Sequence, residues 1–173
     1  MPLTFLVGGA RSGKSALAVE LASASGAPVT FVATAEARDD DMAARISRHR
    51  EARPAGWTTI EASLGLGDVT SALADEPCVV IDCLTLWTSN ALEGGASDDE
   101  IVAEATAIGT ALSARRAPSF VVSNEVGMGI VPMSELARRY RDVLGRVNVA
   151  VSAAADESYL VVAGRTLRLG SLA

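Results

Sequence analysis

The sequence predicts an α/β protein in which helices cover both faces of a mostly parallel β-sheet. Its strand-like segments are short and continuously apolar rather than alternating, which is typical of strands buried on both faces. Segments with apolar residues at helical spacing separate them, as crossovers between parallel strands require. No repeat, linker or low-complexity stretch interrupts residues 1–173, so we expect a single domain.

The first half of the chain is expected to alternate strands and helices. The apolar run 3–7 ends at a glycine pair, and 15–25 carries leucines and alanines at helical spacing until Gly26 ends the helix. The helix expected at 39–53 begins with acidic residues, whose negative charge interacts favourably with the positive end of the helix dipole. Pro54 follows its last residue. The other expected elements here are strands at 28–33, 57–60 and 78–82 and helices at 64–74 and 84–92.

The second half continues the same alternation. Acids in the first turn and arginines at the end favour a helix over 98–115, and an apolar run predicts a strand at 119–123. A loop with two glycines follows at 126–132. The last expected elements are a helix at 134–156, a strand at 159–162 and an edge strand at 166–169 after a turn at Gly164-Arg165.

Composition excludes several classes of protein. Fifteen basic and 21 acidic residues give a net charge of −6, which argues against a general nucleic-acid-binding surface. No apolar run approaches the roughly 20 residues of a membrane span, and no basic segment precedes the apolar start as in a signal peptide. Cys78 and Cys83 would fall on opposite faces of one strand and could not pair. We therefore expect a reduced, cytoplasmic protein.

A phosphate-binding motif joins the first strand to the first helix. Residues 8–15 match Gly-x-x-x-x-Gly-Lys-Ser at every fixed position, which indicates a P-loop NTPase. The glycines let backbone N–H groups turn around phosphate oxygens, and the helix N-terminus adds positive partial charge. Lys14, the only lysine, would contact the terminal phosphates, and the Ser15 hydroxyl would bind Mg²⁺. The expected phosphate-binding residues are Gly8, Gly9, Ala10, Arg11, Ser12, Gly13, Lys14 and Ser15.

Asp82 stands at the carboxyl end of the strand expected at 78–82. Beside a P-loop, an acid in that place is typical of the aspartate that orients Mg²⁺, although such residues also serve as plain helix caps. The guanine-reading Asn-Lys-x-Asp motif of switch GTPases cannot occur, because the only lysine lies in the P-loop. A switch GTPase is therefore not expected.

Four arginines and the only histidine fall within residues 45–53 of this acidic chain. At 100° per residue, Met42, Ile46, His49 and Arg53 share one helix face. Three interpretations fit: a solvated basic face, an arginine lid that clamps phosphates as in small kinases, or a site where His49 attacks the α-phosphorus of a nucleotide.

Five segments together resemble one enzyme family. They are 8–15, 33–38, 45–50, 82–87 and 123–132, and they span nearly the whole chain. The sequence is similar to the bifunctional adenosylcobinamide kinase/adenosylcobinamide-phosphate guanylyltransferases of cobalamin assembly. The resemblance implies a RecA-like core, a homotrimer, GTP as substrate with ATP as an alternative phosphate donor for the kinase step, and Mg²⁺.

The resemblance also implies two reactions and a set of site residues. The hydroxyl of the aminopropanol arm of adenosylcobinamide would take a γ-phosphate, and GMP would pass from GTP through His49 to the resulting phosphate, giving adenosyl-GDP-cobinamide. Asp82 matches the metal-side acid. The further nucleotide contacts it implies are Ala33, Thr34, Ala35, Arg50, Glu51, Ala52, Arg53 and Glu61.

Two other functions remain open on the residues alone. One is a P-loop kinase of another small alcohol or nucleoside with 45–53 as an arginine lid. The other is a nucleotide-binding regulator without catalysis. No corrinoid-binding residues stand out in the sequence, and Trp57 and Trp87 are either stacking residues or, by default, part of the core.

Overall fold

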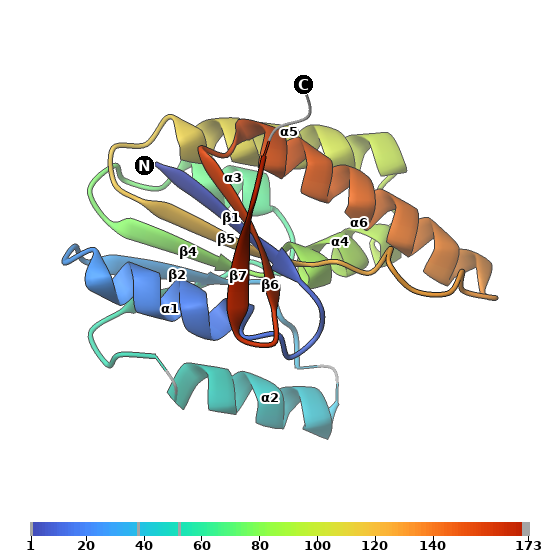
Figure 1. Ribbon diagram of the computed structural model, residues 1–173, viewed down its shortest axis with the longest axis horizontal. Helices are drawn as coiled ribbons and strands as arrows, with labels where there is room; N and C mark the ends of the chain where they lie inside the picture. The colour runs from blue at the N-terminus through green and yellow to red at the C-terminus, as the bar shows by residue number, and fades with distance from the viewer. Residues whose placement is uncertain (1, 38, 52, 171–173) are drawn as a thin grey trace.

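Seven strands form one sheet in the computed structural model, which describes residues 2–37, 39–51 and 53–170. Their order across the sheet is β3-β2-β4-β5-β1-β6-β7 (Figure 1). The strands are β1 (Leu3–Gly8), β2 (Val29–Ala33), β3 (Thr58–Glu61), β4 (Cys78–Asp82), β5 (Ser119–Asn124), β6 (Glu157–Val162) and β7 (Arg165–Leu169).

The first six strands pair in parallel, and β7 pairs antiparallel with β6. The predicted mostly parallel sheet is thus confirmed, including its edge strand. The turn before β7 differs from the prediction by one residue: it lies at Ala163 and Gly164, whose φ angles are 51° and 72°, and not at Gly164-Arg165. A two-residue hairpin turn of this kind requires positive φ at both positions.

The expected helices are present, with small differences at their ends. The largest is in α3, which ends at Ser71 rather than at residue 74. Among the described residues the helices are α1 (Lys14–Ala24), α2 (Asp40–Glu51), α3 (Leu66–Ser71), α4 (Leu84–Glu93), α5 (Asp98–Ser113) and α6 (Glu135–Ala154). No helix in this part of the chain is long and apolar enough to cross a membrane.

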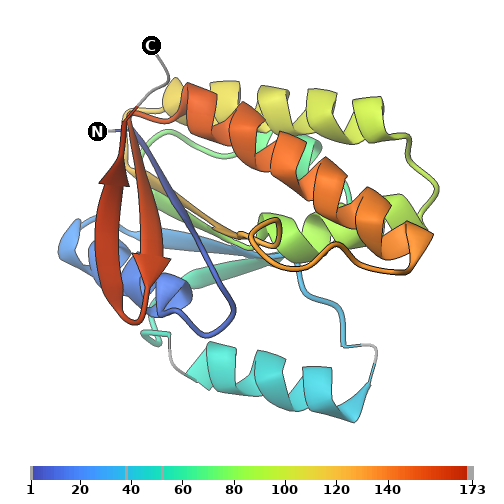
Figure 2. The same ribbon diagram turned by 45° about the vertical axis from the view of Figure 1, so that its right-hand side comes forward.

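Helices cover both faces of the sheet, as predicted. Leu3, Phe5 and Ile81 belong to the apolar cluster that the sheet shares with α3, α4, α5 and α6. Leu6 and Phe31 point to the opposite face, where α1 covers them. Figure 2 shows α5 and α6 on one side of the sheet and α1 and α2 on the other. Because both faces are covered, the central strands β1, β2, β4 and β5 are buried and largely apolar along their length.

Helix α2 is different, because it stands away from the sheet. None of its residues with described burial is buried, whereas every other helix has buried residues. Both views show it beyond α1, separated from the sheet (Figures 1 and 2). Its position therefore depends on a few side-chain contacts near its carboxyl end.

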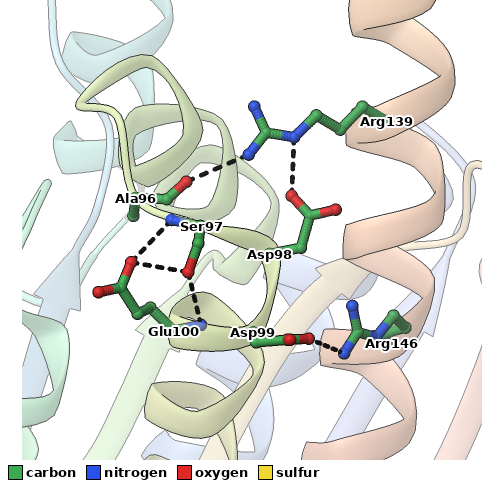
Figure 3. Close-up of polar contacts among 7 residues, drawn as sticks. All are labelled: Ala96, Ser97, Asp98, Asp99, Glu100, Arg139 and Arg146. Carbon is green, nitrogen blue, oxygen red and sulfur yellow. Dashed lines mark hydrogen bonds and ion pairs between the residues drawn. The ribbon is translucent and has the colours of Figure 1, made fainter.

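Helix α5 begins at a capping box and is tied there to α6 (Figure 3). The Ser97 hydroxyl accepts from the Glu100 amide, and the Glu100 carboxylate accepts from the Ser97 amide and hydroxyl. These hydrogen bonds lower the pKa of Glu100. Two ion pairs then join the helices: Arg139 to Asp98 at 2.7 Å and Arg146 to Asp99 at 2.6 Å. The first turn of α5 is thereby joined to α6 at two places, Arg139 near the start of that helix and Arg146 further along it.

The two cysteines are free, as expected, but not for the predicted reason. Cys83 follows the end of β4, so the alternation of strand faces does not extend to it. Both Cys78 and Cys83 pack in the cluster on the α1 side of the sheet. Burial raises the pKa of the Cys83 thiol to about 11.

Gly8 sits where β1 passes closest to β6, and this contact leads to a first prediction. A Cβ at Gly8 would lie 2.2 Å from the Val161 carbonyl oxygen, so Gly8→Ala must push the two strands apart. We expect a loss of about 2 kcal/mol in the free energy of unfolding, measured by denaturant titration. Gly9→Ala is the matched control, because a Cβ there meets nothing within 4 Å, and its effect should stay below about 1 kcal/mol. Equal midpoints for the two variants would contradict this account.

Candidate functional site

The P-loop forms a phosphate-sized cradle between β1 and α1. Arg11 and Gly13 adopt positive φ angles of 55° and 102°, which turns the loop back over the start of the helix. Gly13 caps α1 without a side-chain hydrogen bond, and the N-terminal N–H groups of the helix point towards the loop, where they suit an anion. The Gly164 amide donates to the Ser12 carbonyl at 2.9 Å, which attaches the loop to the β6–β7 turn. This geometry fits the predicted phosphate-binding role.

Lys14 lies inside this cradle. Its Nζ donates to the Gly9 carbonyl at 2.7 Å, and the residue is only 6% exposed. Holding the ammonium group across the loop places a fixed positive charge beside the N-terminal amides of α1. Such an arrangement favours an anion with several negative charges, as a triphosphate has.

The parallel sheet brings Asp82 to the same place. In the strand register, Ala33 of β2 pairs with Asp82 of β4, and Gly8 of β1 pairs with Asn124 of β5. The carboxyl ends of these strands therefore meet at one edge, directly beside the P-loop. The Asp82 side chain is 11% exposed, so a carboxylate is held at the inner wall of the site.

The donor set beside the P-loop suits Mg²⁺. Asp82 and Ser15 both line the cavity that contains the P-loop. Mg²⁺ usually takes one or two protein oxygens and completes its shell with phosphate and water, and these two residues offer a carboxylate and a hydroxyl oxygen.

His49 meets Asp82 from the opposite side of the site. Its Nδ1 lies 3.6 Å from Asp82 Oδ2, and its side chain is 40% exposed. The contact joins the last turn of α2 to the end of β4. Met42, Ile46 and His49 line one cavity, as their predicted shared helix face requires, and Arg53 lines it too although α2 ends before it, at Glu51.

Two cavities meet at His49. The P-loop cavity, of about 640 Å³, lies between the P-loop, α1 and the end of α2, and Asn124 and Arg48 also line it. The α2 cavity, of about 550 Å³, lies between α2 and the ends of β2, β3 and β4. The residues that line both are His49, Arg53, Asp82 and Cys83. A ligand that extends from one cavity into the other would lie beside these shared residues, His49 among them.

The α2 cavity combines apolar walls with a charged pair. Met42, Ile46 and Leu86 supply apolar surface, while Arg50 and Glu61 form an ion pair at its rim. The Arg50 guanidinium is thus held by Glu61 rather than directed at the P-loop. The predicted contacts Ala33 and Ala35 line this cavity too.

Arg53 anchors the end of α2 to the sheet. Its guanidinium lies 3.5 Å from the centroid of the Phe31 ring and donates to Thr59 at 3.4 Å. Phe31 in turn stacks on Trp57, with ring centroids 6.4 Å apart. Burial lowers the pKa of Arg53, and the nearby Asp82 carboxylate opposes that shift.

Some predicted site residues do not reach a cavity. The Thr34 side chain is fully buried, and its hydroxyl both donates to the Cys83 carbonyl at 2.6 Å and accepts from the Cys83 amide at 2.8 Å. It therefore links the ends of β2 and β4. Glu51 is exposed, accepts from Ser47 and lines neither cavity, and Ala52 lies outside the described residues.

Other residues at the site were not predicted as contacts. Asn124 and Leu86 line the two cavities from the ends of β5 and α4. Asn124 directly follows a predicted strand at the carboxyl edge of the sheet, and that position could have indicated that Asn124 belongs to the site. Trp87 is fully buried in the core, which confirms the default interpretation, and Trp57 packs on Phe31.

Comparison with solved structures defines the class of protein. The fold is similar to the ATPase EscN of the enteropathogenic E. coli type III secretion system, with a TM-score of 0.57 at 10% identity over 94% of this chain and 43% of that one. It is also similar to the RadB recombinase, with a TM-score of 0.51 at 17% identity over 91% and 73% of the two chains. The chain therefore has the RecA-like fold of a P-loop NTPase.

The sequence comparisons identify the family within that class. Residues 4–169 match the model of the cobinamide kinase / cobinamide phosphate guanyltransferase family, and the chain belongs to this family. It is 41% identical to the bifunctional adenosylcobalamin biosynthesis protein CobP of Pseudomonas aeruginosa, over 95% of each chain. It is 42% identical to CobU of Salmonella typhimurium, which has the same description, over 94% of this chain and 96% of that one. The predicted resemblance is thus confirmed.

The anchoring role of Arg53 leads to a second prediction. Arg53→Met removes the guanidinium from the Phe31 ring, so α2 should open more often. A buried cation–π contact of about 1 kcal/mol corresponds to a several-fold loss of amide protection across 40–51, measured by hydrogen exchange. Arg48→Met is the control, because the Arg48 guanidinium bonds to Ala44 within its own helix. Unchanged protection in Arg53→Met would show that this contact does not hold the helix.

Proposed function

We propose that this protein phosphorylates adenosylcobinamide with a nucleoside triphosphate and then transfers GMP from GTP to the phosphate it has made. Membership of a family described by both activities supports the two reactions. The finer proposal is that GMP passes through a covalent bond to His49. The products are adenosylcobinamide phosphate in the first reaction and adenosyl-GDP-cobinamide in the second.

The observation that carries the histidine step is the position of His49 at the junction of two cavities. We place the β- and γ-phosphates in the P-loop cavity, against Lys14 and the N-terminal amides of α1. The nucleoside then occupies the α2 cavity, where Ala33, Ala35 and Glu61 line the wall. The α-phosphate joins these two parts of GTP, so it would lie beside the imidazole.

Each side chain has a separate task in this proposal. Lys14 and the P-loop amides bind and orient the triphosphate, because phosphoryl transfer depends mainly on positioning and charge stabilisation. Arg48 and Arg53 add positive charge to the P-loop cavity. Ser15 and Asp82 would hold Mg²⁺, which offsets negative charge on the phosphates when it is bound. ATP can replace GTP in the kinase reaction, since that step needs no guanine.

The test of this function is a product assay. The protein is incubated with adenosylcobinamide, GTP and Mg²⁺, and the corrinoid products are identified by mass. We expect adenosylcobinamide phosphate and then adenosyl-GDP-cobinamide, with release of pyrophosphate. The phosphate alone would indicate a kinase without the second activity, and nucleotide binding without any product would indicate a regulator.

Substitutions at His49 and Lys14 should separate the two reactions, which is a third prediction. His49→Ala removes the covalent step, so guanylyl transfer should fall at least about a thousandfold, whereas phosphorylation should stay within about tenfold of wild type. Lys14→Ala should abolish both reactions, because both place a triphosphate on the P-loop. Rates are followed separately with adenosylcobinamide and with its phosphate as acceptor.

Asp41→Asn is the matched control for both variants. Asp41 is an exposed residue of the same helix as His49 and lines neither cavity, so both rates should match the wild type. Retention of guanylyl transfer in a folded His49→Ala protein would remove His49 from the mechanism.

We also propose that the chain is one domain, works in the cytoplasm and assembles as a homotrimer. Its free thiols suit a reducing compartment. The trimer rests on the family resemblance. It is supported by apolar side chains exposed on the segment between β5 and α6, where Ile130 and Met133 are each 98% exposed. Contiguous apolar surface of this kind is normally covered by a partner.

The proposed trimer gives a fourth prediction. Light scattering at micromolar concentration should report three chains for the wild type. Replacing Ile130 and Met133 together by Ser should shift the mass towards one chain, because the apolar contact is lost. Leu167→Ser on β7 is the control, since Leu167 is also exposed but lies far along the sequence from this segment. A monomeric wild type would contradict the proposal.

A further inference from the structure

A specific nitrogen of His49 faces a carboxylate. Nδ1 lies 3.6 Å from Asp82 Oδ2, which is within ion-pair distance but longer than a hydrogen bond. Catalytic hydrogen bonds are often long before the substrate binds and shorten in the complex. Asp82 ends a strand of the central sheet, whereas His49 belongs to the loosely attached α2. The carboxylate is therefore the more rigid partner of the pair.

We propose that Asp82 is a positioning residue for His49: it keeps the imidazole proton on Nδ1 and leaves the lone pair of Nε2 free to attack. This inference rests on the proposed guanylyl transfer and adds which nitrogen takes the GMP. A neutral imidazole carries one N–H and one lone pair, and the partner of one nitrogen decides the state of the other. An acceptor beside Nδ1 stabilises the Nδ1–H form, so GMP is attached to Nε2.

Three other charged residues that line a cavity with His49 are unsuited to this role. Arg48 and Arg53, which line the P-loop cavity with it, have only donors and cannot accept a proton from Nδ1. Glu61, which lines the α2 cavity with it, is engaged by Arg50. Asp82 is an acceptor, lies at ion-pair distance and is 11% exposed, which strengthens its interaction with the ring.

The two chemical steps balance without any proton leaving the histidine. In the first, the Nε2 lone pair attacks the α-phosphorus, the Nε2–P bond forms, and the bond from phosphorus to the bridging oxygen breaks to release pyrophosphate. The ring, which now has Nδ1–H and an Nε2–P bond, is positively charged, and the Asp82 carboxylate stabilises it. In the second, an oxygen of the acceptor phosphate attacks the phosphorus, the Nε2–P bond breaks, and the neutral Nδ1–H imidazole returns.

The Asp82 carboxylate has two oxygens, so this role is compatible with its proposed place beside Mg²⁺. Oδ2 is the atom nearest the imidazole. Loss of Asp82 would therefore affect both the metal and the histidine, and activity alone cannot separate the two effects. The test must report on the ring itself.

His49 is the only histidine of the 173 residues, so ¹⁵N-histidine labelling gives the signals of one imidazole. Long-range ¹H–¹⁵N spectra are recorded without metal or nucleotide, at a pH where the ring is neutral. In the wild type we expect the proton on Nδ1. In Asp82→Asn the ratio of the Nδ1–H to the Nε2–H form should fall about tenfold or more, because a charged acceptor is lost. Glu51→Gln removes a charge from the same helix and should leave the ratio unchanged.

A second measurement needs no variant at Asp82. The wild-type protein is incubated with GTP and Mg²⁺, and ¹⁵N–³¹P coupling identifies which ring nitrogen carries phosphorus. A bond to Nε2 supports the inference, and a bond to Nδ1 overturns it. A tautomer ratio that is the same in wild type and folded Asp82→Asn also overturns it. Absence of any histidine–phosphorus bond, with the proton nevertheless on Nδ1, would instead contradict the proposed function.

Discussion

The parallel pairing of β1, β2, β4 and β5 is the constraint on which the site depends. Parallel strands end at the same edge, so the P-loop after β1, Asp82 at the end of β4 and Asn124 at the end of β5 converge there. Burial of these strands on both faces of the sheet stabilises their pairing. Close approach of Gly8 to Val161 then fixes the P-loop against β6, and a hydrogen bond from Gly164 to Ser12 holds its far side.

Helix α2 is also attached at this edge of the sheet, but by contacts of a different kind. It contributes no described residue to the core, and the contacts near its end are side-chain contacts: His49 with Asp82, Arg50 with Glu61, and Arg53 on Phe31. Contacts of this kind contribute about 1 kcal/mol each. The residue proposed as nucleophile therefore sits on the least firmly packed helix, while the phosphate-binding residues and Asp82 are built into the sheet edge. Orientation of the imidazole by Asp82 compensates for that looser attachment.

Much of the fold could be predicted from local sequence because the buried strands are short apolar runs and helices α2, α5 and α6 begin at acidic or capping residues. The P-loop could be predicted as well, since its spacing is specific. The role of Thr34 could not, because its hydroxyl bonds to Cys83, 49 residues away. Neither could the stack of Arg53 on Phe31 or the meeting of two cavities at His49, since these depend on how α2 is placed. The proposed roles of the site residues remain predictions.

We propose that His49 carries GMP, and recovery of the adduct between GMP and His49 tests this most directly. The protein is incubated with GTP labelled at the α-phosphate and with Mg²⁺, then denatured and digested. If His49 carries GMP, the label will be on the peptide that contains His49. It will be lost in acid and retained in base, as a phosphoramidate requires. No retained label, label that survives acid but is lost in base, or label on a peptide without His49 would contradict it.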